Sequence, residues 1–368
     1  MSLNLSQIRR ELHRVPELAF REHKTKELLL AQLEKLPRIR VQEFSTNTGI
    51  LVEYSEGNGP YRLFRADMDA LPITENTGCA FSSQHPGLMH ACGHDIHMTV
   101  LLGLIERVVS QALPRNLLFL FQPAEEGEGG AQSVLAEGLI QEYEVEAAFA
   151  LHVASGLPVG TVSSRAGIFF GIPQEFDVSF IGRSAHAAFP EKGVNALFAA
   201  RDFLNLMEKD LAELSAKHKL IFHVGKLEAG TVRNAVPELC LLQGTHRSLE
   251  KALSLQINQL IHENAARAAQ NQGADFEVKL LGTYDPVVNS PALLQKLKNA
   301  CAQTDTKFQE AEIALTGEDF GFFTSLYPGL LFWLGSGCSE PLHSSKFLAD
   351  EACIDVGLKV FEALALLD

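Results

Sequence analysis

The sequence predicts an α/β protein with a mostly parallel central sheet, into which a smaller α+β unit is inserted. Three observations lead to this fold class. Short apolar runs without alternation are typical of strands buried on both faces. Amphipathic stretches lie between these runs, as in α/β folds. A middle region alternates polar and apolar residues, as half-exposed strands do. At 368 residues, the chain has the length of roughly two domains.

The larger domain is predicted from apolar runs and the helices between them. The runs expected as buried parallel strands are residues 61–66, 117–122, 147–151 and 330–334. Helices are expected at 25–36, with Thr25 as the N-cap and Pro37 as the stop, and at 98–110. We therefore expect residues 1–170 and 283–368 to form this domain.

The inserted unit is expected to comprise residues 171–282. Its predicted strands include the alternating segments 176–180, 223–227 and 239–243, and helical spacing occurs at 195–214 and 253–270. The chain is expected to leave the larger domain near residue 170 and to return to it near residue 283.

Charge and composition argue against several classes of partner. The chain has 31 Lys and Arg against 45 Asp and Glu, a net charge of −14, which disfavours nucleic acid and anionic lipid. No apolar run of about 18 residues and no signal-peptide pattern occurs, so a cytoplasmic protein is expected. The six cysteines are dispersed and need no disulfide role. The sequence also contains no G-x-S-x-G elbow, P-loop or H-E-x-x-H motif.

Polar side chains follow each of the four buried runs. Open α/β sheets bind ligands outside the carboxyl ends of their strands, so polar residues gathered there by separate segments predict a site. The residues concerned are Asp67 and Asp69 after the first run, Glu125 and Glu126 after the second, His152 after the third and His343 after the fourth.

The densest polar cluster is M-H-A-C-G-H-D-I-H at 89–97, which includes Cys92 and His94. Thiolate and imidazole are preferred donors for zinc-like ions, and paired carboxylates such as Glu125 and Glu126 can supply a metal ligand and a proton acceptor. Three alternatives stay open: a structural role for 89–97, a solvated Glu–Glu loop, and a Cys92 nucleophile paired with His94.

Five motifs resemble those of the aminoacylase-type, dinuclear-metal amidohydrolases, in the branch that contains hippurate hydrolases and indole-acetyl-amino-acid hydrolases. They are R-A-D-M-D-A-L-P (65–72), M-H-A-C-G-H-D-I-H (89–97), F-Q-P-A-E-E-G-x-G-G-A (121–131), T-G-E-D-F-G (316–321) and F-W-L-G (332–335). The resemblance extends from residues 9–18 to 342–346. It implies hydrolysis of the amide bond of an N-acyl amino acid, a small-molecule substrate.

The resemblance also implies roles for individual residues. Two divalent ions per subunit are implied, and zinc, manganese, cobalt and nickel all suit a mixed S, N and O ligand set. The implied ligands are Cys92, His94, Glu126, His152 and His343. Glu125 is the implied general base, which argues against a metal-binding protein without catalysis. Asp69 and Asp67 are implied to orient a ligand imidazole, and the alternative is that they cap a turn.

The inserted unit resembles the satellite domain through which this family dimerises, so a homodimer is expected. His186, in S-A-H-A-A-F-P (184–190), matches a histidine that stabilises the oxyanion in a neighbouring subunit's site. Asn234 and Arg247 match positions that hold the substrate carboxylate. The alternatives are a plain loop residue for His186, a turn cap for Asn234 and a surface ion pair for Arg247. The chain departs from the family pattern at 183–185 and 344–350.

Overall fold

The computed structural model describes residues 3–127 and 129–366, which form two compact units. Unit 1 comprises Met1–Phe169, Val287–Ile313 and Glu318–Asp368, and unit 2 comprises Phe170–Pro286 and Ala314–Gly317. The second piece of unit 2 lies outside the insert expected at 171–282. It joins unit 2 through its backbone, because the Gly171 N–H donates to the Ala314 carbonyl at 2.9 Å.

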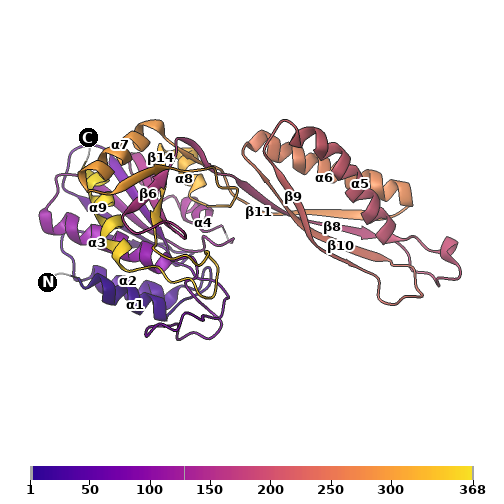
Figure 1. The fold of residues 1–368 in the computed structure, drawn as a ribbon, viewed down its shortest axis with the longest axis horizontal. Helices are drawn as coiled ribbons and strands as arrows, with labels where there is room; N and C mark the ends of the chain where they lie inside the picture. The colour runs from indigo at the N-terminus through magenta and orange to yellow at the C-terminus, as the bar shows by residue number, and fades with distance from the viewer. Residues whose placement is uncertain (1–2, 128, 367–368) are drawn as a thin grey trace. The chain divides into compact units, whose positions relative to one another are not determined.

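Unit 1 contains a ten-stranded mixed sheet with the order β1-β2-β4-β3-β5-β14-β12-β7, to which β6 adds beside β14 and β13 adds beside β6 (Figure 1). The neighbours β4, β3, β5 and β14 run parallel to one another. This confirms the predicted mostly parallel sheet, and these four strands contain the four predicted apolar runs. The bounds are β1 (Arg40–Glu43), β2 (Ile50–Ser55), β3 (Tyr61–Asp67), β4 (Asn116–Gln122), β5 (Val145–Ala154), β6 (Thr161–Ser164), β7 (Gly167–Phe170), β12 (Val287–Asn289), β13 (Lys307–Glu310) and β14 (Gly329–Gly335).

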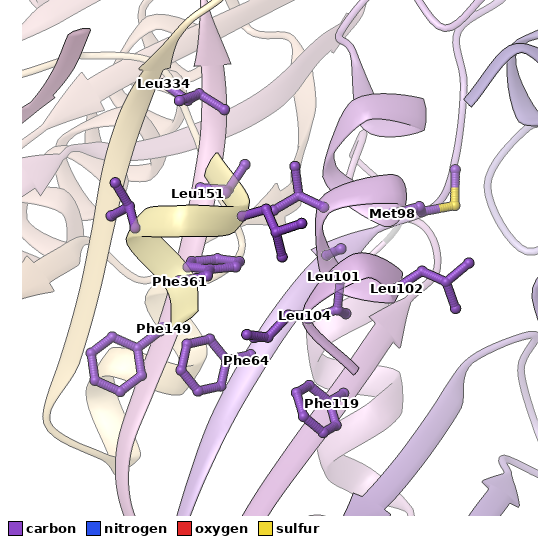
Figure 2. Packing of buried hydrophobic residues seen from close by; sticks show 14 of the residues in the cluster. Phe64, Met98, Leu101, Leu102, Leu104, Phe119, Phe149, Leu151, Leu334 and Phe361 are labelled. Atoms are coloured by element: carbon purple, nitrogen blue, oxygen red, sulfur yellow. The ribbon is translucent and has the colours of Figure 1, made fainter. Parts of the chain in front are cut away.

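The helices of unit 1 pack on this sheet and bury a continuous apolar core. Figure 2 shows α3 and α9 contributing Leu101, Leu104 and Phe361 to the core around Phe64 and Phe149, whose ring centroids are 5.0 Å apart. Within the described part of the chain, no helix combines the length and apolarity needed to cross a membrane. The helices are α1 (Leu5–Arg14), α2 (His23–Leu33), α3 (His94–Gln111), α4 (Gly130–Ala136), α7 (Pro291–Gln303), α8 (Gly321–Leu326), α9 (Ala352–Leu366) and the 3-10 turn η1 (Ile140–Glu142).

The predicted ends of the second helix are wrong. The helix begins at His23 and ends at Leu33, so Thr25 lies inside it and Pro37 lies beyond its end. Thr25 is buried, and its N–H and hydroxyl both donate to Glu17 Oε2, at 2.9 and 3.0 Å. The Glu17 carboxylate therefore satisfies one of the N-terminal N–H groups of the helix, and Thr25 is not its N-cap.

Unit 2 is a four-stranded antiparallel sheet, in the order β11-β8-β10-β9, with two long helices over one face (Figure 1). Phe176 and Phe180 from the sheet pack with Phe203 and Ile257 from the helices. Strand β11 was not predicted, although its sequence D-F-E-V-K-L alternates. The elements are β8 (Ile172–Ile181), η2 (Pro190–Lys192), α5 (Ala196–Ser215), β9 (Ile221–Ala229), β10 (Leu239–Ser248), α6 (Lys251–Gln272) and β11 (Asp275–Thr283).

Candidate active site

The polar residues predicted from the strand ends meet at one edge of the central sheet of unit 1. Asp67 ends β3, His152 lies near the end of β5, and His94 begins α3. Glu125 and Glu126 follow β4, and the segment with Cys92 and that with His343 join them through the contacts described below. Because the strands are parallel and adjacent, their carboxyl ends place these segments together.

Five side chains form what we name the donor cluster: Cys92, His94, Glu126, His152 and His343. The Cys92 sulfur lies 3.3 Å from His152 Nε2 and 3.3 Å from His343 Nε2. Glu126 Oε1 lies 3.2 Å from His343 Nε2 and 4.0 Å from His94 Nε2. The structure therefore brings together all five side chains that the family resemblance implied as ligands.

The backbone around Cys92 requires glycine at position 93. Gly93 has φ +83°, and a Cβ built there would lie 2.4 Å from Val153 Cγ2. This left-handed residue lets α3 start at His94, only two residues after Cys92. The His343 N–H donates to the Ala91 carbonyl at 2.9 Å, which fixes the last histidine beside the sulfur.

Hydrogen bonds fix the tautomers of two histidines in the donor cluster. His94 Nδ1–H donates to the Asp69 carbonyl at 2.9 Å, and His152 Nδ1–H donates to the Val153 carbonyl at 2.8 Å. These bonds leave Nε2 of each ring as the nitrogen that faces the cluster, where it can bind a metal once it carries no proton.

The electrostatics of the donor cluster fit divalent cations. His94 Nε2 is buried and has no hydrogen-bond partner among the described residues. Burial disfavours charge on His94, yet Asp67 and Asp69 outweigh burial and raise its pKa to about 10. Burial and His97 lower the pKa of His152 to about 3, so this ring stays neutral. The surplus negative charge and the neutral soft donors suit a cation, and a bound cation would also favour the Cys92 thiolate.

Glu125 is the carboxylate beside the donor cluster. Its side chain is buried, which rules out a solvated loop at this position. Burial and the nearby carboxylates of Glu318, Glu126 and Asp319 raise the pKa of Glu125 well above its usual value. A raised pKa suits a group that accepts and then returns a proton near neutral pH.

The turn that carries the carboxylate pair is held from two sides. The Ala124 N–H donates to Glu22 Oε1 at 3.0 Å, and the Glu126 N–H donates to Asp69 Oδ2 at 2.9 Å. Asp69 therefore accepts from the Glu126 backbone through its carboxylate and from the His94 ring through its carbonyl, and does not merely cap the turn after its own strand. Sequence reasoning did not find Glu22, because it precedes this turn by about a hundred residues and belongs to no motif.

His97 and a buried ion-pair network were also missed. His97 Nδ1–H donates to Asp67 Oδ1 at 2.5 Å, and His97 Nε2 accepts the Val153 N–H at 2.9 Å, so both ring nitrogens are occupied. Arg65 donates to Asp67 Oδ2 at 2.8 Å and to Asp319 Oδ1 at 2.7 Å. The sequence could have pointed to these residues, since Arg65, His97 and Asp319 all lie inside motifs that carry the resemblance.

The remaining predicted residues belong to unit 2. His186 is exposed, and its Nδ1 accepts the Ala188 N–H at 3.0 Å, which leaves the proton on Nε2. The Ala187 N–H donates to the carbonyl of the exposed Asn234 at 2.9 Å, so these two segments lie together. Arg247, on β10, is half-buried, and burial lowers its pKa while Glu175 and Tyr284 oppose that shift.

The fold and the site define the class of protein, and comparison with known families agrees. Residues 63–367 match the model of peptidase family M20/M25/M40, and the chain belongs to this family. The family resemblance expected from the motifs is therefore confirmed.

Individual proteins of known name are similar to this chain over nearly its full length. The chain is 39% identical over 362 residues to N-acetyldiaminopimelate deacetylase of Oceanobacillus iheyensis, covering 97% of each chain. It is 40% identical to the enzyme of that name from Streptococcus uberis, with 98% of each chain covered. Among solved structures, it is similar to Bacillus subtilis YXEP protein, described as a dinuclear metal binding peptidase from M20 family, with a TM-score of 0.85, 29% identity and coverage of 98% and 96%.

Proposed function

We propose that the protein is a metal-dependent amidohydrolase that converts N-acetyl-L,L-diaminopimelate and water into L,L-diaminopimelate and acetate, in lysine biosynthesis in the cytoplasm. The observation that carries this proposal is the donor cluster with the buried Glu125 directly beside it. The full-length similarity to N-acetyldiaminopimelate deacetylases supports the choice of substrate.

Two divalent cations are proposed to bind at Cys92, His94, Glu126, His152 and His343. Cations bound at these donors supply a Lewis acid that polarises the amide carbonyl and makes a nearby water more acidic. Zinc, manganese, cobalt and nickel all suit these ligands. The dinuclear description of the Bacillus subtilis neighbour supports the number of ions.

Glu125 is proposed to move the proton. Its carboxylate accepts a proton from the attacking water and then returns it to the departing amino group, so that the amine leaves in neutral form. Burial of Glu125 keeps bulk water from competing for this proton. Asp67 and Asp69 are positioning residues, since they hold His97, His94 and the Glu126 backbone in place.

The unit 2 residues are proposed to act on the substrate of a neighbouring subunit in a homodimer. The Nε2–H of His186 suits an oxyanion donor, and Arg247 suits a carboxylate partner together with Asn234. Dimerisation through unit 2 is supported by the edge position of β9, where Leu227 is 42% exposed, and by Leu239 at 53% on the adjacent β10.

The test is a substrate panel with the metal-reconstituted protein. Release of acetate from N-acetyl-L,L-diaminopimelate is compared with release from N-acetyl-L-lysine, which keeps the scissile amide and the amine but lacks the second carboxylate. N-succinyl-L,L-diaminopimelate and N-benzoylglycine complete the panel. We expect the highest kcat/KM for N-acetyl-L,L-diaminopimelate, since it carries both the small acyl group and the second carboxylate.

An alternative function in the same class is a broader N-acyl-amino-acid or hippurate-like amidohydrolase. Equal kcat/KM values for N-benzoylglycine and N-acetyl-L,L-diaminopimelate would favour that alternative. Hydrolysis of none of the four compounds by fully metal-loaded protein would overturn the amidohydrolase proposal itself.

A further inference from the structure

A second cluster of reactive side chains lies in unit 1, and the proposed reaction does not use it. The Cys79 sulfur, a ring nitrogen of His13 and an oxygen of Glu75 all lie within 4.8 Å of one another. The sulfur is 3.6 Å from Glu75 Oε1 and 3.5 Å from Ser82 Oγ. Cys79 is half-buried, whereas His13 is buried.

Two carboxylates hold His13 as an imidazolium. His13 Nδ1 lies 2.7 Å from Asp95 Oδ2, and Arg9 Nε approaches the same oxygen at 2.9 Å, which keeps Asp95 ionised. His13 Nε2 lies 3.3 Å from Glu75 Oε1. Burial disfavours the charge on His13, but Asp95 and Glu75 outweigh it and raise the pKa of His13 to about 10. Both ring nitrogens therefore carry protons near neutral pH.

The charges that face this cluster come from three segments. Burial lowers the pKa of His90 to about 3, so His90 stays neutral and His13 is the cationic ring. The guanidinium carbons of Arg9 and Arg10 lie 4.8 and 5.2 Å from the centre of the Phe81 ring, two residues from Cys79. The titratable and charged groups concerned are Arg9, Arg10 and His13 from α1, Glu75 from the loop before Cys79, and His90 and Asp95 from the segment that leads into α3 and its first turn.

We propose that Cys79 is a modification site, a thiolate paired with the His13 imidazolium that reacts with soft electrophiles such as alkyl halides and hydroperoxides. A cation beside the sulfur and an orienting carboxylate behind the imidazole are the arrangement that activates cysteine elsewhere. With hydrogen peroxide, the sulfur attacks one oxygen, the S–O bond forms as the O–O bond breaks, and hydroxide leaves and takes up a proton. Cys79 is oxidised by two electrons to a sulfenic acid, and the peroxide is reduced to water.

The other cysteines differ from Cys79 in environment. Burial opposes the thiolate of Cys79, but hydrogen bonds to His13, Thr77 and Ser82 outweigh it and lower the pKa of the Cys79 thiol to about 7. Cys92, Cys240, Cys301 and Cys353 are buried, and burial raises the pKa of each. Cys338 is half-buried like Cys79 and serves as the internal reference.

The experiment measures alkylation of the metal-loaded protein by iodoacetamide between pH 5.5 and 9.5, with the labelled fraction of each cysteine read by peptide mass spectrometry. We expect the Cys79 rate to reach half of its plateau near pH 7, against about pH 8.5 for an ordinary thiol. At pH 6 we expect Cys79 to react about fivefold faster than a model peptide thiol of pKa about 8.5, since its lower intrinsic nucleophilicity offsets part of the gain in thiolate. A half-plateau at or above pH 8.5, or labelling of Cys338 before Cys79, would overturn the proposal.

A His13→Gln variant tests the source of the thiolate. We expect its half-plateau to rise by about one pH unit, because the imidazolium that stabilises the thiolate is gone. An unchanged profile in a variant with a wild-type circular dichroism spectrum would overturn the role of His13. Because His13 is buried, the wild-type profile, which needs no substitution, is the deciding measurement.

Discussion

Glu125 carries the proton transfer in the proposed reaction, and replacement by its neutral isostere tests that role. We expect Glu125→Gln to lower kcat by about 10²–10⁴-fold, the usual contribution of a general base. The bound metal should stay at the wild-type amount, since Glu125 is not a member of the donor cluster. Initial rates and elemental analysis of the same preparation check both expectations.

The matched control for this variant is Glu142→Gln, the same chemical change at an exposed position. It should leave both kcat and metal content unchanged. Near-normal turnover in Glu125→Gln would remove Glu125 from the mechanism.

A serine variant tests whether Cys92 is a metal ligand or a nucleophile. Its sulfur lies 3.3 Å from imidazole nitrogens of both His152 and His343, which suits a shared metal site. We expect Cys92→Ser to lose bound metal together with activity, because a hydroxyl is a poor donor to these ions. Cys338→Ser, at a half-buried site, should lose neither. If Cys92→Ser keeps full metal occupancy but loses all activity, a nucleophilic role for Cys92 is favoured.

At the scale of elements, the turn after β4 positions both glutamates and depends on Gly130. A Cβ built at Gly130 would lie 1.7 Å from the Pro123 carbonyl oxygen, so an alanine forces the backbone of the turn to move. We expect Gly130→Ala to lower the free energy of unfolding by about 1–3 kcal/mol, as overpacking does. Urea unfolding of the metal-loaded protein measures this change.

Gly225→Ala is the control for the turn, because its nearest neighbour would lie at an ordinary 3.6 Å. Its free energy of unfolding should stay within about 0.5 kcal/mol of wild type. Kcat should fall in Gly130→Ala only, since the displaced turn carries Glu125. Equal unfolding midpoints for the two variants would contradict the role of the turn.

The elements that sequence reasoning found are those with a local signal. The runs at 117–122 and 330–334 are continuously apolar because β4 and β14 are buried on both faces, so the pattern and the structure share one cause. Strand β11 carried a comparable alternating signal, and the prediction overlooked it.

Tertiary contacts determine the features that the sequence pattern does not predict. The start of α2 depends on Glu17, which accepts hydrogen bonds from Thr25. The segment 314–317 joins unit 2 from more than thirty residues beyond the insert expected to end at 282, at a backbone contact with no composition signal. The candidate ligands were found because their residue types are rare together, whereas the partners of Arg65 could not be identified without the fold.

At the scale of the whole molecule, the proposed active site needs two chains. His186→Ala and Glu125→Gln should each be inactive alone, since one lacks the oxyanion donor and the other lacks the base. Mixed dimers of the two variants would contain one composite site with both groups intact. We expect a mixture to regain up to about a quarter of wild-type activity, because half of the dimers are mixed and each has one intact site of two.

Subunit exchange is measured independently in this experiment, by native mass spectrometry of one variant labelled with heavy isotopes. If mixed dimers form and activity does not return, His186 does not act across the dimer. His186→Ala with wild-type turnover would remove the residue from the reaction altogether.

The central claim is that cations held at the donor cluster of unit 1 are required for deacetylation of N-acetyl-L,L-diaminopimelate. The direct measurement removes metal with a chelator, then adds divalent cation back stepwise while metal per chain and acetate release are recorded on the same samples. The account predicts no hydrolysis at zero metal and full recovery at two ions per chain. Hydrolysis that persists in protein shown to be free of metal would contradict it.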